Sequence, residues 1–234
     1  MSKEKELSAD SGGHGENRVA VVTGARIGGI SFAIALKLLL AGWVVVMGDR
    51  DKGAGTEAVK RLRKHGFKRV WFSHTDFSNE FQVGALMDLI RQKFGKLNLL
   101  VNTSGSAGNP VDDNLAKLTP TGLCDLFRDN VLTFYNMTRA AVTQFMQHQE
   151  TGGVVVALST NNGILGIRGQ MGYGALKQSL VSFCRSLTVA YASRGIRFVV
   201  VTPGVVVTNS ANWQRRLATN PGWPDIEGRL NPTG

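Results

Sequence analysis

The sequence contains only two cysteines, Cys124 and Cys184, among its 234 residues. They lie far apart in the chain and form no metal-ligand spacing, so neither a disulfide framework nor a zinc site is indicated. We therefore expect two buried, reduced thiols and no bound metal.

The sequence also lacks any long hydrophobic run. Its longest candidate, residues 38–47, follows Lys37 and contains Gly42, and it falls short of the roughly 18 apolar residues of a spanning helix. Residues 1–17 carry lysines and acidic residues but not the apolar core of a secretory signal. The sequence thus predicts no membrane partner, a disordered polar tail over 1–17 and a cytoplasmic location.

What the sequence does have is the composition of a folded domain. Hydrophobic residues make up 43% of the chain and charged residues 19%, which is too apolar for a disordered protein. At about 150 residues per domain, the length allows one or two domains with a full hydrophobic core. No internal repeat or linker divides residues 18–208, so we expect a single domain over 18–234.

The charge is one-sided, because 27 lysines and arginines against 17 acidic residues give a net charge of +10. Such a balance raises the hypothesis of a nucleic acid partner. The densest basic cluster has no interleaved aromatic residues for base stacking; it comprises Lys60, Arg61, Arg63, Lys64, Lys68 and Arg69. We favour a solvated helix face and expect no nucleic acid partner; salt-sensitive nucleic acid binding is the weaker alternative.

Short β-branched runs alternate with longer helical patterns, which is typical of a parallel sheet covered by helices on both faces. Strands are expected at 19–23, 44–49, 70–73, 97–102, 154–159 and 197–202, and helices at 30–41, 53–65, 80–94, 119–147 and 171–193. This order predicts an α/β fold with a doubly wound, mostly parallel sheet. In such folds, ligands bind in the crevice at the carboxyl ends of the strands.

A glycine-rich turn joins the first expected strand to the first expected helix. It runs from Thr23 to Ser31 as TGARIGGIS, and such a turn lets backbone N–H groups approach a pyrophosphate at the helix N-terminus. Asp49 closes the second strand, where a carboxylate can accept a hydrogen bond from an adenine-ribose hydroxyl. The motif predicts a dinucleotide site; a purely structural turn beside a strand-end aspartate is the alternative.

A tyrosine and a lysine four positions apart form the most specific pattern of the sequence. Tyr173 and Lys177 lie on an expected helix, and residues four apart share one helical face. A hydroxyl side chain, Thr160, precedes them after a β-rich run, and Pro203 and Gly204 follow the next strand. These surrounding features distinguish the pair from a Tyr-xxx-Lys sequence that occurs by chance.

Asn130 is a polar residue on an otherwise apolar helical face. Leu123, Phe127 and Phe134 share this face and are expected in the core. Burying the amide without partners would cost roughly a few kcal/mol, so Asn130 is a candidate functional residue. The alternative is an asparagine that only hydrogen-bonds a neighbouring backbone group.

Together these motifs resemble those of the short-chain dehydrogenases/reductases, over about residues 18–208. Relative to the family's glycine motif, one residue is inserted between Gly24 and Gly29, and Ser31 replaces the final glycine. Residues 102–105 are Asn-Thr-Ser-Gly where the family has Asn-Asn-Ala-Gly, and Thr160 stands where serine is usual. The resemblance implies a Rossmann-like fold and hydride transfer between a nicotinamide cofactor and a secondary alcohol or ketone.

By the same resemblance, Tyr173 exchanges a proton with the substrate oxygen, and Thr160 hydrogen-bonds that oxygen. Lys177 binds the nicotinamide ribose. Together with the oxidised cofactor it is expected to lower the pKa of the phenol from about 10 towards 7, a change of roughly 4 kcal/mol. Asn130 holds a water that links the lysine to solvent.

The resemblance also implies which residues contact the cofactor. They are Gly24, Arg26, Gly28, Gly29, Ile30, Asp49, Arg50, Asp76, Phe77, Asn102, Gly105, Tyr173, Lys177, Pro203, Gly204, Val206 and Thr208. Asp49 repels a 2′-phosphate and favours NAD, whereas Arg26 or Arg50 could pair with that phosphate. NAD is therefore the expected cofactor, with NADP as the alternative.

The expected pocket rim mixes apolar and amide side chains and selects no particular small-molecule substrate: Ser104, Ala107, Asn109, Ile164, Gln170, Asn212 and Trp213. Arg215 and Arg216 would suit an acidic handle such as an acyl carrier thioester, although a solvated face is favoured for both. Two alternatives to an alcohol dehydrogenase or carbonyl reductase stay open. They are an NADPH-dependent 3-oxoacyl thioester reductase and a catalytically impaired dinucleotide-binding sensor.

In the family, a substrate-covering segment, another helix and a seventh strand follow the residues matched here. This sequence ends at Gly234, so residues 209–234 are expected to form an incomplete substrate-covering segment. An absent seventh strand would expose the edge of the sixth, and an open edge favours association. We expect weak stability of the monomer and a homodimer or homotetramer.

Overall fold

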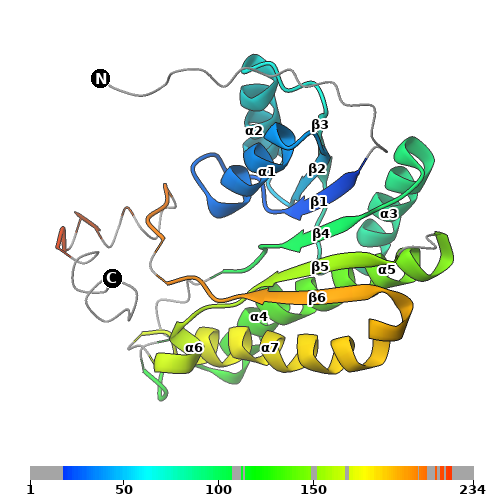
Figure 1. Ribbon diagram of the computed structural model, residues 1–234. Helices are drawn as coiled ribbons and strands as arrows, with labels where there is room; N and C mark the ends of the chain where they lie inside the picture. Colours follow the sequence, from blue (N-terminus) through cyan, green and yellow to red (C-terminus); the bar gives the residue numbers. More distant parts are fainter. Residues whose placement is uncertain are drawn as a thin grey trace.

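The computed structural model describes residues 18–106, 112, 114–148, 152–166, 169–204, 206–209, 214, 217–218 and 220–222. The expected tail over 1–17 and most of the segment 209–234 lie outside these residues. The described part of the chain forms one parallel sheet with helices on both faces (Figure 1). The predicted doubly wound α/β fold is therefore confirmed.

Six strands build the sheet in the order β3-β2-β1-β4-β5-β6. Their bounds are Val19–Thr23 (β1), Val44–Asp49 (β2), Val70–His74 (β3), Leu99–Asn102 (β4), Gly153–Leu158 (β5) and Ile196–Val201 (β6). Every adjacent pair is parallel. The chain moves outward from β1 in one direction to β3 and then returns to start again at β4. Ligands of such sheets bind where the strand order reverses, here between the ends of β1 and β4.

The helices lie where the periodicity predicts them, with three exceptions. Their bounds are Ile30–Leu40 (α1), Lys52–Lys64 (α2), Glu80–Phe94 (α3), Pro120–Phe127 (α4), Thr133–His148 (α5), Asn162–Leu165 (α6) and Met171–Tyr191 (α7). The single helix expected over 119–147 is instead α4, a π-helical turn at Arg128–Leu132 (η1) and α5. The sequence did not predict α6, nor the 3₁₀ turn at Ala192–Arg194 (η2).

The two faces of the sheet carry separate apolar layers. On one face, Val22 and Val45 pack with residues of α1 and α2 such as Leu39 and Leu62. On the other face, residues of β1, β2, α3 and α5 form the largest cluster, and α7 packs against β5 and β6. Strands β1 and β2 are buried almost throughout, as expected for strands covered on both sides.

The π-helical turn corrects two sequence expectations. Leu123 and Phe127, predicted in the core beside Asn130, are 42% and 46% exposed, whereas Leu126 is only 4% exposed. A π turn holds more residues than an α turn, so it rotates the helix face that precedes it. Cys124 on the same helix is exposed, not buried, while Cys184 on α7 is buried as predicted.

Within the described residues, β6 pairs only with β5 and forms one edge of the sheet. Exposed side chains alternate along β6 with buried or half-buried ones, and Val199 and Val201 are 46% and 43% exposed. No helix among the described residues combines the length and the apolar character that crossing a bilayer requires.

Candidate functional site

The glycine-rich turn after β1 forms a tight loop that leads into α1. Gly24 and Gly28 adopt φ angles of +87° and +73°, which favour glycine. The Gly29 N–H donates to the Arg26 carbonyl at 3.1 Å, and α1 begins at Ile30. Ser31 is buried beneath the turn, where its Oγ would lie 3.3 Å from a Cβ on Gly24. The turn thus accommodates Ser31 and leaves the N-terminus of α1 ready for an anion.

Asp49 ties the end of β2 to this turn. One carboxylate oxygen accepts from the Ala25 N–H and the other from the Asp51 N–H, both at 2.9 Å. Arg26 lies 3.5 Å from Asp51 in an exposed ion pair. Arg50, directly after β2, donates to Asp129 of η1 at 3.2 and 3.4 Å. Both arginines that could bind a 2′-phosphate are therefore paired with carboxylates.

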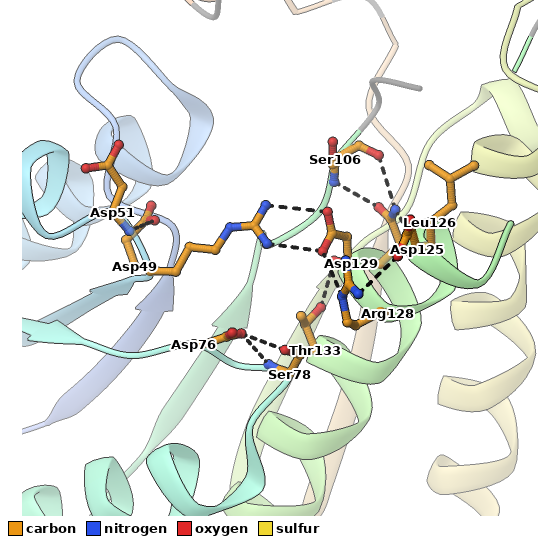
Figure 2. A network of polar contacts seen from close by, with 12 residues as sticks. Asp49, Asp51, Asp76, Ser78, Ser106, Asp125, Leu126, Arg128, Asp129 and Thr133 are labelled. Atoms are coloured by element: carbon orange, nitrogen blue, oxygen red, sulfur yellow. Dashed lines mark hydrogen bonds and ion pairs between the residues drawn. The ribbon is translucent and has the colours of Figure 1, made fainter. Parts of the chain in front are cut away.

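Asp76 follows β3 and is held in place by Ser78, whose N–H and Oγ donate to one carboxylate oxygen at 2.9 and 2.7 Å (Figure 2). Burial raises the pKa of Asp76, but these bonds and the nearby charges of Arg50 and Arg128 outweigh it and leave the pKa lowered. Phe77 packs so closely on β2 that a Cβ on Gly48 would lie 2.6 Å from its ring.

Thr23 organises the end of β4. Its Oγ1 donates to the Asn102 side chain at 3.1 Å and accepts from the N–H groups of Thr103 and Ser104, both at 2.9 Å. The Asn102 amide also donates to the Phe134 carbonyl at 3.3 Å. The segment that replaces the family's second motif is therefore anchored at the strand-order reversal, beside the glycine-rich turn.

Asn130 and Lys177 meet at Gly105. The Asn130 amide donates to the carbonyls of Leu126 and Ser106 at 2.9 and 3.1 Å, and its Oδ1 accepts from the Ser106 N–H at 3.2 Å. A Cβ on Gly105 would lie 2.6 Å from that Oδ1 and 3.0 Å from Lys177 Nζ. Because Gly105 has no side chain, these two buried polar groups can both approach its backbone.

Lys177 is buried and holds its ammonium group against two carbonyls. Its Nζ donates to Leu158 at 2.9 Å and to Ser104 at 3.4 Å. Burial lowers the pKa of Lys177 to about 8. The Ser159 Oγ donates to the Lys177 carbonyl at 2.8 Å, which anchors α7 to the end of β5. The Ser159 side chain therefore contacts the backbone of α7.

Tyr173 and Thr160 complete the candidate set. Tyr173 lies one turn before Lys177 on α7 and is half-buried, and burial raises its pKa to about 12. In the chain without cofactor, burial sets the direction of this pKa shift. The lowering expected from Lys177 and the oxidised cofactor together stays a prediction. Thr160 is buried just after β5, and its Oγ1 accepts from the Asn162 N–H at 3.3 Å.

Sequence reasoning missed Asp112, a fully buried residue that contacts the first turn of α7 from outside the helix. Its two carboxylate oxygens accept from the N–H groups of Gly172 and Tyr173 at 2.6 and 3.0 Å, and its carbonyl accepts from Met171 at 3.3 Å. The carboxylate therefore satisfies the first free N–H groups of the helix that carries Tyr173.

The segment after β6 returns to the glycine-rich turn. The Pro203 carbonyl accepts from Asn161 at 3.3 Å, and the Asn209 N–H donates to Gly28 at 3.3 Å. Gly204, Val206 and Thr208 lie on this connection, which meets the glycine-rich turn at Asn209. Val206 is 40% exposed.

The expected pocket rim is described only in part. Ser104 Oγ is buried without a hydrogen-bond partner, Gln170 is buried and accepts from the Asn162 amide, and Ile164 is 63% exposed. The remaining rim candidates, Ala107, Asn109, Asn212 and Trp213, and the arginines Arg215 and Arg216, lie outside the described residues.

The described residues fit a nicotinamide dinucleotide. No side chain caps the N-terminus of α1, which suits a pyrophosphate, and Asp49 ends β2 where a carboxylate suits a ribose. The polar groups of Asn130 and Lys177 at Gly105 would lie towards the reacting end. Ser104, whose carbonyl accepts from Lys177, also carries a buried Oγ for which the described residues provide no hydrogen-bond partner.

Comparison with known proteins agrees with this geometry. A family model described as short chain dehydrogenase matches residues 18–217. A Caenorhabditis elegans protein named dehydrogenase/reductase SDR family member 4 is 32% identical over 82% of this chain and 72% of its own length. A 7alpha-hydroxysteroid dehydrogenase of Paraclostridium sordellii is 30% identical over 84% and 72%.

Among solved structures, that of ElxO with NADP bound superposes with a TM-score of 0.82 at 23% identity, over 93% of this chain and 84% of that one. At this identity the likeness concerns the fold. The sequence matches and the site geometry together lead to one conclusion: the chain belongs to the short-chain dehydrogenase/reductase family of oxidoreductases.

Proposed function

We propose that this chain transfers a hydride between a nicotinamide cofactor and a secondary alcohol or ketone, with Tyr173 as the general acid and base. The observation that carries the proposal is the meeting of Asn130 Oδ1 and Lys177 Nζ at Gly105, one helical turn from Tyr173. The relative named as a hydroxysteroid dehydrogenase supports an alcohol as the substrate class.

Each residue has a distinct task in the proposed reaction. With a pKa near 12, Tyr173 is protonated at neutral pH and donates its proton to the carbonyl oxygen during reduction. Thr160 hydrogen-bonds the same oxygen, and Lys177 holds the ribose and returns a proton through the site of Asn130. When bound, the nicotinamide supplies or accepts the hydride, and its oxidised ring adds the positive charge that a phenolate requires.

NAD is the cofactor that we favour. Asp49 stays at the ribose end of β2, and the two candidate phosphate ligands, Arg26 and Arg50, already pair with Asp51 and Asp129. A 2′-phosphate would therefore meet carboxylates as well as arginines. NADP remains the alternative, since a guanidinium binds phosphate as readily as carboxylate.

The substitution Tyr173→Phe tests the proposal, because it removes only the hydroxyl. We expect unchanged cofactor affinity by fluorescence titration with NADH and NADPH, and a fall in kcat of about 10²- to 10⁴-fold. The assay is a panel of ketones, secondary alcohols and a 3-oxoacyl thioester. Full activity of the variant would remove Tyr173 from the mechanism, whereas cofactor binding without turnover in the wild type would favour a sensor.

We also propose a homo-oligomer, on the ground that β6 forms an edge with exposed valines in the described sheet. Sedimentation velocity at several protein concentrations measures this directly, and a monomer at all concentrations would refute it. No nucleic acid partner is proposed.

A further inference from the structure

An ion pair joins two sides of the candidate cofactor site. Arg50, directly after β2, donates to both carboxylate oxygens of Asp129 in η1, although the two residues are 79 positions apart in the sequence. Figure 2 shows Asp129 facing the end of β2, where Asp49 and Asp51 lie. The pair therefore links β2 to the helical segment that carries Asn130.

Asp129 is the fixed partner of this pair. Its carbonyl accepts from the Thr133 Oγ1 at 2.9 Å, and Arg128 Nε lies 3.8 Å from the carboxylate. The Asp129 side chain is 19% exposed, whereas that of Arg50 is 63% exposed. A rearrangement at this point would consequently move Arg50 and leave Asp129 in place.

The pair lies beside the residues expected to contact the adenosine. The hydrogen bond and charge of Asp129 raise the pKa of Arg50, and burial opposes them; the charges of Asp76 and Asp49 add to the rise. These two further carboxylates are the expected contacts of adenine and ribose. Arg50 is thus already surrounded by negative charge at the point where a 2′-phosphate would enter.

We propose that Asp129 sets the cofactor discrimination of this chain by holding Arg50 away from a 2′-phosphate. The inference rests on the proposed function, because it concerns the adenosine end of the same site. A guanidinium pairs bidentately with a carboxylate or with a phosphate, so a 2′-phosphate has to displace Asp129 in order to reach Arg50. A 2′-hydroxyl does not have to displace Asp129. Asp129 therefore adds to the selectivity for NAD over NADP that Asp49 provides.

The test replaces Asp129 by a neutral residue of the same shape and uses ligands that lack the nicotinamide. For Asp129→Asn we expect binding of 2′-phospho-ADP-ribose to tighten about fivefold, and that of ADP-ribose to change less than about twofold, by isothermal titration calorimetry. In an Arg50→Gln background, Asp129→Asn should no longer improve binding of the phosphorylated ligand, because the responding guanidinium is absent.

Asp125→Asn is the matched control, since Asp125 pairs with Arg128 at 3.0 Å on the same helical segment. It should leave the ratio of the two affinities unchanged, and a thermal melt of each variant verifies that it is folded. The inference is overturned if Asp129→Asn leaves the ratio of the two affinities unchanged, or if it tightens binding of 2′-phospho-ADP-ribose equally in the Arg50→Gln background. In either case, binding of ADP-ribose would still support the cofactor site. Absence of binding of either ligand to every variant overturns the proposed cofactor site and the inference with it.

Discussion

Burial moves the two proton-transfer candidates in opposite directions. It raises the pKa of Tyr173 from 10.0 to about 12 and lowers that of Lys177 from 10.5 to about 8. In both residues burial disfavours the charged form. At neutral pH the phenol therefore keeps its proton, and the lysine stays mostly cationic but close to the range in which it can exchange one.

The lowered pKa of Lys177 predicts a pH-dependent stability. Between pH 8 and 10.5 the unfolded chain holds a proton that the folded chain has lost, so the free energy of unfolding rises with pH in this window. The penalty is fully present below pH 8. Relative to a Lys177→Met variant, the wild type should gain about 2 to 3 kcal/mol between pH 7 and pH 10, measured by urea denaturation.

Comparing the wild type with Lys177→Met removes the contributions of two other residues that change stability with pH in the opposite direction. The raised pKa values of Tyr173 and Cys184 make the folded chain hold protons longer, which lowers stability above about pH 9, equally in both proteins. A constant difference between wild type and variant across the pH range would show that Lys177 titrates normally and is not desolvated.

At the scale of elements, the start of α7 depends on a residue outside the helix. Asp112 accepts two N–H groups of the first turn, and its replacement by alanine leaves them without a partner in the core. We expect Asp112→Ala to lower the free energy of unfolding by about 2 kcal/mol. It should also lower kcat more than cofactor affinity, because it frees the turn that carries Tyr173.

Two variants separate this role from a general loss of charge. Asp112→Asn keeps one acceptor oxygen and should recover part of both losses, while Asp88→Ala removes an exposed carboxylate on α3 and should change stability by less than about 0.5 kcal/mol. Denaturation and steady-state kinetics on the three variants provide the measurement. Equal effects for Asp88 and Asp112 would contradict the assignment.

The sheet and its covering helices could be predicted because their signals are local. Continuous β-branched runs such as Val19–Thr23 and Val44–Asp49 require a strand buried on both faces, and the structure has them at the expected bounds. The glycine-rich turn and the spacing of Tyr173 and Lys177 are likewise local patterns, because each spans only a few residues. Asn130 was identified by its polarity; of the core neighbours named for its face, Phe134 is buried as predicted, whereas Leu123 and Phe127 are exposed.

The contacts that the sequence did not reveal are long-range or depend on irregular backbone. Asp112 acts on residues 60 positions later, and Arg50 meets Asp129 across 79 positions. Neither distance leaves a pattern in the sequence. The π turn at Arg128–Leu132 rotates the side chains before it relative to those after it. A face assigned with 3.6 residues per turn throughout is therefore wrong on one side of the π turn.

At the scale of the whole molecule, the net charge of +10 should weaken the folded state at low salt through self-repulsion. Part of the basic cluster is structural, because Arg63 and Arg69 donate to the carbonyls of Val70 and Gly42 at 2.8 and 3.0 Å. We expect the melting temperature to rise by about a few degrees between 20 and 300 mM sodium chloride, as the Debye length falls below about 10 Å. Differential scanning fluorimetry measures it, and a falling melting temperature would show that ion pairs such as Arg50–Asp129 outweigh the repulsion.

The strand order has a consequence for how the chain is made. The strand synthesised first, β1, occupies the interior of the sheet, and each later strand joins an outer edge, first through β2 and β3 and then through β4, β5 and β6. No strand has to be threaded between two that have already paired. The polypeptide leaves the ribosome from its N-terminus. The sheet can therefore assemble in the order of translation, each new strand pairing with one exposed edge strand.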